Sequence, residues 1–477
     1  MRDIPVGNGS FLVNFDDKYQ IRDIYFPHVG QENHTEGFPS RFGVWADGDF
    51  SWVHEDEWQR TIKYLTDTLV TGVTLRNEIL GLEMICNDAV AGHDNIYFRR
   101  IEVRNLWDSN RNVRVFFHHD FRIYENKVGD TAYYDPETFS LIHYKKHRYF
   151  LINTDPHFDS FATGRKAFRN SEGTWRDAED GELHGGAITE GSVDSTIAVH
   201  FGLEPQGKSE FHYWIAAGTS HKEVAELNTK VHQHTAPKYQ TETRTLWEDW
   251  LVRSTIDFED LSPAVIDLYK RSLLIVRTQI DDGGAIIAAN DHDVTERATD
   301  HYSYLWPRDG AFVANCLDIA GYPDISQKFS HSAVRLCMNA VTFNKSLIRT
   351  GALDLAGTHS GISSETFRFS PSKKMKPLLF CGRFGSTLIN IAMSNLQNRC
   401  TTIWSFVVRI LWSSFVTLKR SFQNQVGISG KIDSVYILLR VPRLSRGYVR
   451  RRILHANSPK LSELYDTTRP PMKLSRL

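Results

Sequence analysis

The acidic residues of this chain almost disappear beyond one point, and this break limits what the chain can fold into. Residues 1–329 contain 33 Lys and Arg against 52 Asp and Glu, whereas residues 330–477 contain 23 Lys and Arg against five acids. The two parts therefore carry net charges of about −19 and +18, although the whole chain carries only −1. Such an asymmetry between two parts of one chain requires a separate explanation for each part.

Residues 1–218 alternate between apolar and polar side chains, which is the pattern of antiparallel strands. The runs GSFLVNF (9–15), YQIRDIYF (19–26) and NVRVFFHH (112–119) are examples, and turns rich in Gly, Asp and Asn separate such runs. No helical period lies between them. Many strands joined in this way favour a large antiparallel β-sandwich.

The hydrophobic period then changes to that of helices. We predict a helical linker over residues 219–260, interrupted at Pro237, and then a helix with Ser262 as its N-cap and Pro263 as its first residue. Gly283 and Gly284 are expected to end this helix. The sequence therefore predicts a multidomain α and β protein in which a β-sandwich domain (1–218) precedes a helical domain that begins at residue 261.

Candidate functional residues are densest in the segment that follows this helix, GGAIIAANDHDVTERATDHYSYLWPRDGAFVANCLDIAGYPD (283–324). Within it, aromatic side chains are spaced two apart, and a basic and an acidic residue follow them: Tyr302, Tyr304, Trp306, Arg308 and Asp309. Aromatic faces stack on the apolar faces of sugar rings. Arg beside Asp supplies donors and acceptors that suit vicinal hydroxyl groups. The segment thus predicts a carbohydrate site.

A structural interpretation explains the same charged pair without a ligand. Asp309 is suited to cap a helix that begins at Ala311, and Arg308 is then its ion-pair partner. Residue types alone favour this structural interpretation over the carbohydrate site.

The segment resembles the opening of the catalytic domain of glycoside hydrolase family 15, the glucoamylase family, in its bacterial and archaeal form. The family pattern GxIIAAxD and then YxYxWxRDGA stands here at residues 284–291 and 302–311, and IPVGNGSFLVNFDDKYQIRDIYFPHVGQENH (4–34) resembles the family's β-domain. The resemblance covers residues 1–329. It implies that residues 261–329 are the first helices of an (α/α)6 toroid of six helical hairpins. It also implies that Tyr302, Trp306, Arg308 and Asp309 line the pocket for a terminal glucose, with Pro307 at a tolerant position.

The family's chemistry implies an activity and also a defect in this chain. The activity is inverting hydrolysis of terminal α-glucosidic bonds in an α-glucan or malto-oligosaccharide, without a cofactor or metal. One glutamic acid protonates the leaving oxygen and a glutamate about 6.5–9.5 Å away activates water. The acid of the family lies in an SxDLWEE-like motif, and no SxDLWE stands in this chain. We therefore assign no catalytic residue and expect the chain itself to be inactive.

A shift of the reading frame in residues 330–477 restores the missing family sequence. We let each true codon combine the third base of one residue with the first two bases of the next. SKKMKPLLFCGRFGSTLINIAMSN (372–395) can then read IQEDETALVLWAVWEHFDKYRNVE, and residues 417–434 can read AETKLPKPSWDLWEDR, which contains the missing motif. We interpret residues 330–477 as an out-of-frame translation of the rest of the catalytic domain, and expect a tail without a native-like fold.

Other interpretations of the chain differ in class. RLSRGYVRRR (443–452) is suited to neutralising phosphates of a nucleic acid, but this explains only the basic charge of the tail, so we expect no nucleic-acid partner. The β-sandwich is alternatively a remnant carbohydrate-binding module, or the chain is a nonfunctional product. A parent enzyme acting on an α-1,6-glucan or trehalose also fits the motif.

Location and assembly are constrained more weakly. The longest apolar run (403–416) is too short to span a bilayer and contains Arg409. The N-terminus lacks the pattern of a secretory signal, and the five cysteines lack metal-site spacing. We expect a cytoplasmic protein without a membrane partner, and the sequence leaves the oligomeric state open.

Overall fold

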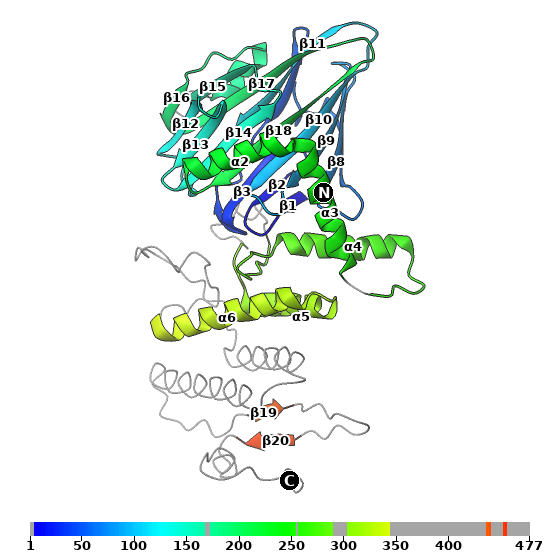
Figure 1. The fold of residues 1–477 in the computed structure, drawn as a ribbon, viewed down its shortest axis with the longest axis vertical. Helices are drawn as coiled ribbons and strands as arrows, with labels where there is room; N and C mark the ends of the chain where they lie inside the picture. The colour runs from blue at the N-terminus through cyan, green and yellow to red at the C-terminus, as the bar shows by residue number, and fades with distance from the viewer. Residues whose placement is uncertain are drawn as a thin grey trace. The chain divides into compact units, whose positions relative to one another are not determined.

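The chain runs from antiparallel strands into helices (Figure 1), as the two hydrophobic periods predict. The computed structural model describes residues 4–166, 172–253, 256–289, 303–343, 436–439 and 452–455. The chain divides into two units, Met1–Thr366 and Phe367–Leu477. In the second unit the described residues form strands β19 (Tyr436–Leu439) and β20 (Arg452–His455), which pair antiparallel.

Three sheets make up the β-part of the first unit. The smallest has the order β1 (Ile4–Gly7), β2 (Leu12–Phe15), β3 (Ile21–His28) and β4 (Gln31–Asn33). The largest has the order β16 (Ile188–Gly191), β12 (Asp130–Asp135), β13 (Ser140–Lys145), β14 (Arg148–Asp155), β18 (Lys208–Gly218), β10 (Ile96–Asn105), β9 (Leu82–Val90), β8 (Thr71–Asn77) and β7 (Gln59–Tyr64). The third has the order β15 (Ser160–Arg165), β17 (Val193–Leu203), β11 (Arg111–His119), β5 (Phe42–Ala46) and β6 (Asp49–Trp52).

The two larger sheets pack face to face over a shared apolar core, which is the predicted sandwich arrangement. Phe117 of β11 stacks on Tyr213 of β18 with ring centroids 4.3 Å apart. Residues of both sheets and of β1–β3 belong to one buried cluster. Strand β18 is the centre of the largest sheet, because it pairs with β14 on one side and with β10 on the other. It thereby joins two groups of strands that are otherwise separate.

A fully buried carboxylate, Asp88 of β9, organises the polar part of this core. It accepts hydrogen bonds from the hydroxyls of Tyr19 (2.6 Å), Thr71 (2.6 Å) and Tyr97 (2.5 Å), and from Nε of Arg99 (2.7 Å). These partners come from β8, β10 and the turn between β2 and β3. The single charge of Arg99 compensates that of Asp88, as a buried carboxylate requires.

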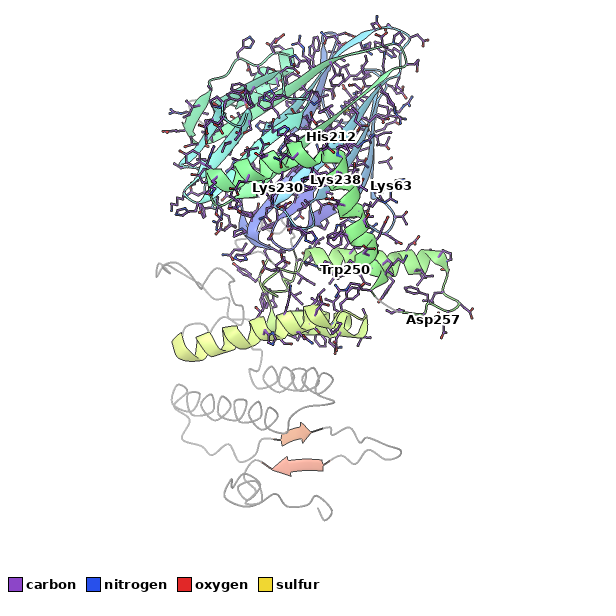
Figure 2. All side chains as sticks on the ribbon, viewed as in Figure 1. Lys63, His212, Lys230, Lys238, Trp250 and Asp257 are labelled. Carbon is purple, nitrogen blue, oxygen red and sulfur yellow. The ribbon has the colours of Figure 1, made fainter. Side chains whose placement is uncertain are left out.

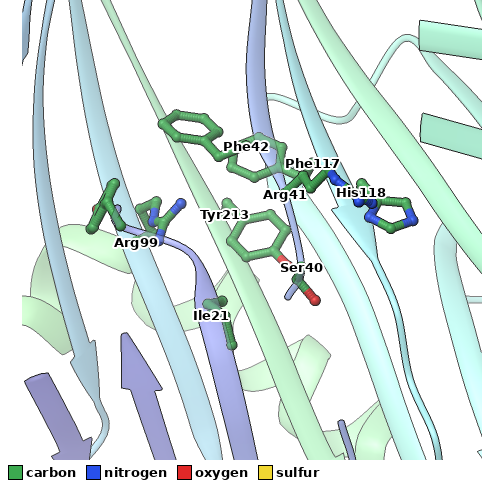
Figure 3. A pocket seen from close by; sticks show the side chains of 9 residues that line it. Ile21, Ser40, Arg41, Phe42, Arg99, Phe117, His118 and Tyr213 are labelled. Carbon is green, nitrogen blue, oxygen red and sulfur yellow. The ribbon is translucent and has the colours of Figure 1, made fainter. Parts of the chain in front are cut away.

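A small internal cavity lies beside this cluster (Figure 3). Its volume is about 10 Å³, and it is lined by Tyr19, Ile21, Ser40, Arg41, Phe42, Arg99, Phe117, His118 and Tyr213. Such a volume accommodates about one water molecule. The cavity is therefore too small for a sugar ring and is separate from the predicted carbohydrate site.

Helices occupy the predicted linker and the segment after it. They are α1 (Thr174–Asp177), the 3-10 helix η1 (Ala178–Asp180), α2 (His221–His234), α3 (Ala236–Val252), α4 (Pro263–Thr278), α5 (Pro307–Ile319) and α6 (Pro323–Phe343). The break in the linker lies at Thr235 rather than at Pro237, because Pro237 is accommodated in the first turn of α3. Among the described residues, no helix combines the length and apolar character needed to cross a bilayer.

Helix α4 begins as predicted and ends earlier than predicted. Its first residue is Pro263, with Ser262 as N-cap, but it stops at Thr278. Gly284 instead lies in the turn that follows, with a φ of +92°. This turn is closed by the hydrogen bonds Gly284 N–Asp281 O (2.8 Å) and Asp281 N–Ala285 O (2.9 Å), so the chain leaves the helix before the glycines.

Removal of the Asp88 charge is expected to destabilise the sandwich strongly. In Asp88→Asn, Arg99 keeps a buried charge without its partner, and we expect a loss of about 3–5 kcal/mol in the free energy of unfolding. Urea unfolding of the full chain, followed by circular dichroism, measures this loss. Glu78→Gln removes one of the two carboxylate partners of Arg76, in an exposed pair, and is expected to leave the unfolding midpoint unchanged. A loss below about 1 kcal/mol for Asp88→Asn would contradict the role of this pair.

Candidate functional site

The predicted carbohydrate residues lie where an extended segment enters helix α5. Tyr304, Trp306, Arg308 and Asp309 are all within the described part of the chain, whereas Tyr302 lies outside it. Trp306 is extended, with φ −95° and ψ 110°, and it is the N-cap residue of α5. Pro307 is then the first helical residue, a position that suits its fixed φ and its missing N–H group.

The indole of Trp306 carries an unpartnered donor. Its ring is half-buried, and its Nε1 atom is buried without a hydrogen-bond partner among the described residues. A buried donor without an acceptor costs about 1–3 kcal/mol. Such a group is suited to bind an oxygen atom of a ligand.

Arg308 and Asp309 form an ion pair in the first turn of α5. Nη2 of Arg308 lies 3.3 Å from Oδ2 of Asp309, and their side chains are 50% and 45% exposed. The helix begins at Pro307, so the expectation of a helix beginning at Ala311 with Asp309 as its cap is wrong. Proline directly after Trp306 allows this earlier start. The ion pair of the structural interpretation is present, and Asp309 near the helix N-terminus also interacts favourably with the helix dipole.

The two motif segments lie side by side in the structure. The backbone N–H of Ala288, in the GxIIAAxD segment, donates to the carbonyl oxygen of Tyr304 at 3.1 Å. Ile287 packs with Leu12, Tyr25 and Val29 in a buried apolar cluster. The first motif therefore links the β-sheet to the segment that carries Trp306.

Two motif glycines permit close packing against helix α6. A Cβ atom at Gly284 would lie 2.4 Å from the carbonyl oxygen of Lys328, and one at Gly310 would lie 2.6 Å from Cε2 of Phe329. Helix α6 runs without interruption from Pro323 to Phe343, and it therefore crosses the boundary at residue 329 that the sequence resemblance suggested. Helix α3, which carries Trp250 (Figure 2), is also attached here. Trp250 stacks on Tyr322 with ring centroids 4.2 Å apart, and its carbonyl oxygen accepts from the Tyr322 hydroxyl at 3.1 Å.

Sequence reasoning missed two polar residues of this region. Asp281 lies 3.1 Å from Nδ1 of His28, and Ser303 lies 3.4 Å from the hydroxyl of Tyr25. The only local signal for Asp281 was an acidic pair before two glycines. Ser303 stands between two motif aromatics, but nothing in the sequence indicated its partner.

The chain has detectable relatives, although no protein-family model matches it. An uncharacterized glycosyl hydrolase of Methanocaldococcus jannaschii is 26% identical over 330 residues, which are 68% of this chain and 51% of that protein. The chain thus spans about half the length of this curated relative.

Solved structures resemble the chain at lower sequence identity. A bacterial glucoamylase complexed with acarbose superposes with a TM-score of 0.56 at 14% identity, over 68% of this chain and 48% of that one. A putative kojibiose phosphorylase from the human microbiome gives a TM-score of 0.42 at 7% identity, over 69% of this chain and 46% of that one. The likeness to the glucoamylase shows that the chain has a glycoside hydrolase-like fold. Membership of family 15 and closure of a toroid stay predictions.

A larger residue at Gly310 is expected to separate α5 from α6. In Gly310→Val the added atoms would overlap the ring of Phe329, and overpacking of this kind costs about 1–3 kcal/mol. Limited proteolysis of the full chain should then cut faster within residues 303–343 and at an unchanged rate within the sandwich. Asn315→Val places the same side chain at an exposed position of α5 and serves as the control. Equal cleavage of the two variants would contradict the packing role of Gly310.

Proposed function

We propose that this chain derives from a glycoside hydrolase of glucoamylase type, which hydrolyses terminal α-glucosidic bonds in oligo- and polysaccharides with inversion. The name of the curated relative and the glucoamylase-like fold support a carbohydrate substrate. The observation that carries the proposal is the buried indole N–H of Trp306, which has no partner among the described residues and lies two residues before the Arg308–Asp309 pair. These groups supply a ring face, donors and an acceptor on one short segment.

The proposed pocket binds the terminal sugar by complementary groups. The Trp306 ring stacks on the apolar face of the sugar, and its Nε1–H donates to a hydroxyl oxygen. Asp309 accepts from one hydroxyl while Arg308 donates to its neighbour. Tyr302 is the remaining pocket residue of the proposal and lies outside the described residues. These residues orient the substrate and do not transfer the proton.

We further propose that this chain cannot turn over substrate, because its tail is out of frame. Inversion needs a general acid and a general base. Residues that now read QVGISGKID (425–433) can read the acid motif SWDLWED in the shifted frame. Loss of general acid catalysis alone costs about 10²–10⁴ in rate. The SWDLWED string supports the frame interpretation, since it restores the acid motif in the same displacement that restores the string at residues 372–395.

Sequencing of the gene and its mRNA across codons 320–340 tests the frame interpretation. If fresh sequence contains a single-base insertion or deletion, the frameshift is real and the chain is the product of a disrupted enzyme gene. If the frame is intact in fresh sequence, the organism carries the active enzyme. The interpretation is contradicted if fresh sequence encodes the same tail and its alignment with the gene of an in-frame relative shows no insertion or deletion near codon 330.

The pocket assignment is tested in a frame-restored protein. We expect hydrolysis of maltotriose to release β-glucose, and Asp309→Asn to lower kcat/KM by about 10–100-fold, because a hydrogen bond to a charged group contributes about 1.5–3 kcal/mol. Anomer-resolved NMR and initial rates give both results. Asp267→Asn, on an exposed position of α4, is the matched control and should keep full activity. Equal activity of the two variants would remove Asp309 from the pocket.

A remnant carbohydrate-binding module is the second candidate. Folding of the β-sandwich as a separate module is favoured by the polar core around Asp88, because its partners Tyr19, Thr71, Tyr97 and Arg99 all lie within residues 1–218. Binding of maltose-like sugars by residues 1–260 without turnover would support this function. Lack of binding together with insolubility of the full chain would indicate a nonfunctional product.

A further inference from the structure

Strand β3 and the turn after it form a surface on which the candidate sugar-binding segment rests. The hydroxyl of Tyr25 lies 3.4 Å from Oγ of Ser303, and both side chains are buried. Val29 is also fully buried and packs against Ile287. The β-part of the molecule therefore contacts both motif segments from the same side.

Gly30 permits the closest of these contacts. Its φ of +81° lies in the left-handed region, and an added Cβ atom would lie 2.9 Å from Cδ1 of Ile287 and 3.1 Å from the carbonyl oxygen of Ser303. Any side chain here would push the two motif segments away from β3. The distance between β3 and residue 303 is thus set by the lack of a side chain at residue 30.

Asp281, in the segment that follows helix α4, forms hydrogen bonds with the turn after β3. Its Oδ2 atom accepts from the backbone N–H of Val29 at 3.2 Å and lies 3.1 Å from Nδ1 of His28, while its Oδ1 atom accepts from the N–H of Gly283 at 2.7 Å. The carboxylate is 7% exposed and the His28 ring is 53% exposed. A largely buried carboxylate is thereby held on one side by β3 and on the other by the turn before the first motif.

We infer that His28, Gly30 and Tyr25 are positioning residues that set the placement of Trp306 and Arg308 through residues 285–288 and 303–305. The connection is continuous along the chain. Asp281 N donates to Ala285 O at 2.9 Å, and Ala288 N donates to Tyr304 O at 3.1 Å, two residues before Trp306. The inference rests on the proposed function for its sugar ligand, and it adds a contribution of the β-part to the pocket.

The charge of His28 makes this positioning dependent on pH. The hydrogen bond to Asp281 raises the pKa of His28 above its ordinary value of 6.5, against the lowering effect of burial. Glu32 and Arg148 are the other charged groups that act on the ring, and they pair with each other. Because the pKa is raised in the folded state, the stabilisation is complete below pH 6.5 and is lost as the pH rises through the raised pKa.

Hydrogen exchange of the full chain tests the inference without a sugar. We expect His28→Gln to lower the protection factors of residues 285–289 and 303–306 by about 3–10-fold at pH 6. This is the effect of losing a hydrogen bond to a charged group, reduced because the His28 ring is half exposed. At pH 8.5 the difference from the unchanged chain should be smaller, because a neutral His28 makes only an uncharged hydrogen bond to Asp281. Strands β10 and β18 should keep their protection at both pH values. A loss that is equal at both pH values, or no loss at pH 6, overturns the inference.

A glycine pair supplies the matched test of the close contact. Gly30→Ala should lower protection of the same two segments. Gly129→Ala should not, because Gly129 has a similar φ of +87° but its added Cβ meets no atom nearer than 3.7 Å. If Gly30→Ala keeps full protection, Gly30 is not a positioning residue.

Binding of maltotriose to the full chain, measured by calorimetry, separates this inference from the proposed function. If the chain binds, His28→Gln should weaken binding by a similar 3–10-fold at pH 6 and by less at pH 8.5. If the unchanged chain does not bind while the exchange pattern is as expected, the positioning role stands and the proposed sugar pocket fails. Binding that is insensitive to His28→Gln at pH 6 overturns the positioning role.

Discussion

The buried ion pair between Asp88 and Arg99 is the constraint on which the rest of the first unit depends. A carboxylate in an apolar interior requires a compensating charge and several donors, and here the donors come from β8, β10 and the turn before β3. The hydrogen bond from Tyr19 to Asp88 therefore holds the residue just before β3 against the buried ion pair. Strand β3 ends at His28, next to Asp281, so the strand that begins beside this buried pair ends at the turn before the first motif.

The sequence predicted element types well, because each depends on local pattern. Alternation indicated the strands, and Ser262–Pro263 marked the start of α4. It did not predict the sheet order or the true end of α4, since the turn at Asp281 is closed by tertiary contacts with β3. Aromatic spacing identified the candidate segment, but the start of α5 was placed too late. His28 and Asp281 are 253 residues apart, and no local pattern records such a contact.

The first helices leave apolar side chains exposed in the described part of the chain. Leu268 on α4 is 67% exposed, and Phe312 and Ile319 on α5 are 58% and 77% exposed. Phe312 and Ile319 are seven residues apart and thus lie on the same helix face. This arrangement suits helices that pack against each other through one face and against further helices through the opposite face. The proposed parent enzyme requires such packing. In an out-of-frame product the same faces favour self-association.

The central place of β18 has a consequence for how the chain is made. On a ribosome the chain emerges from its N-terminus, so β7–β10 and β12–β14 are synthesised before the strand that joins them. Until residue 218 has emerged, β10 and β14 each present an unpaired edge to solvent or to a neighbouring nascent chain. The sheet closes late, through pairings such as Ile96 with Ala216, which need a long loop to be closed. The integrity of the reading frame through β18 therefore decides whether any folded product forms, well before the frame at residue 330 matters.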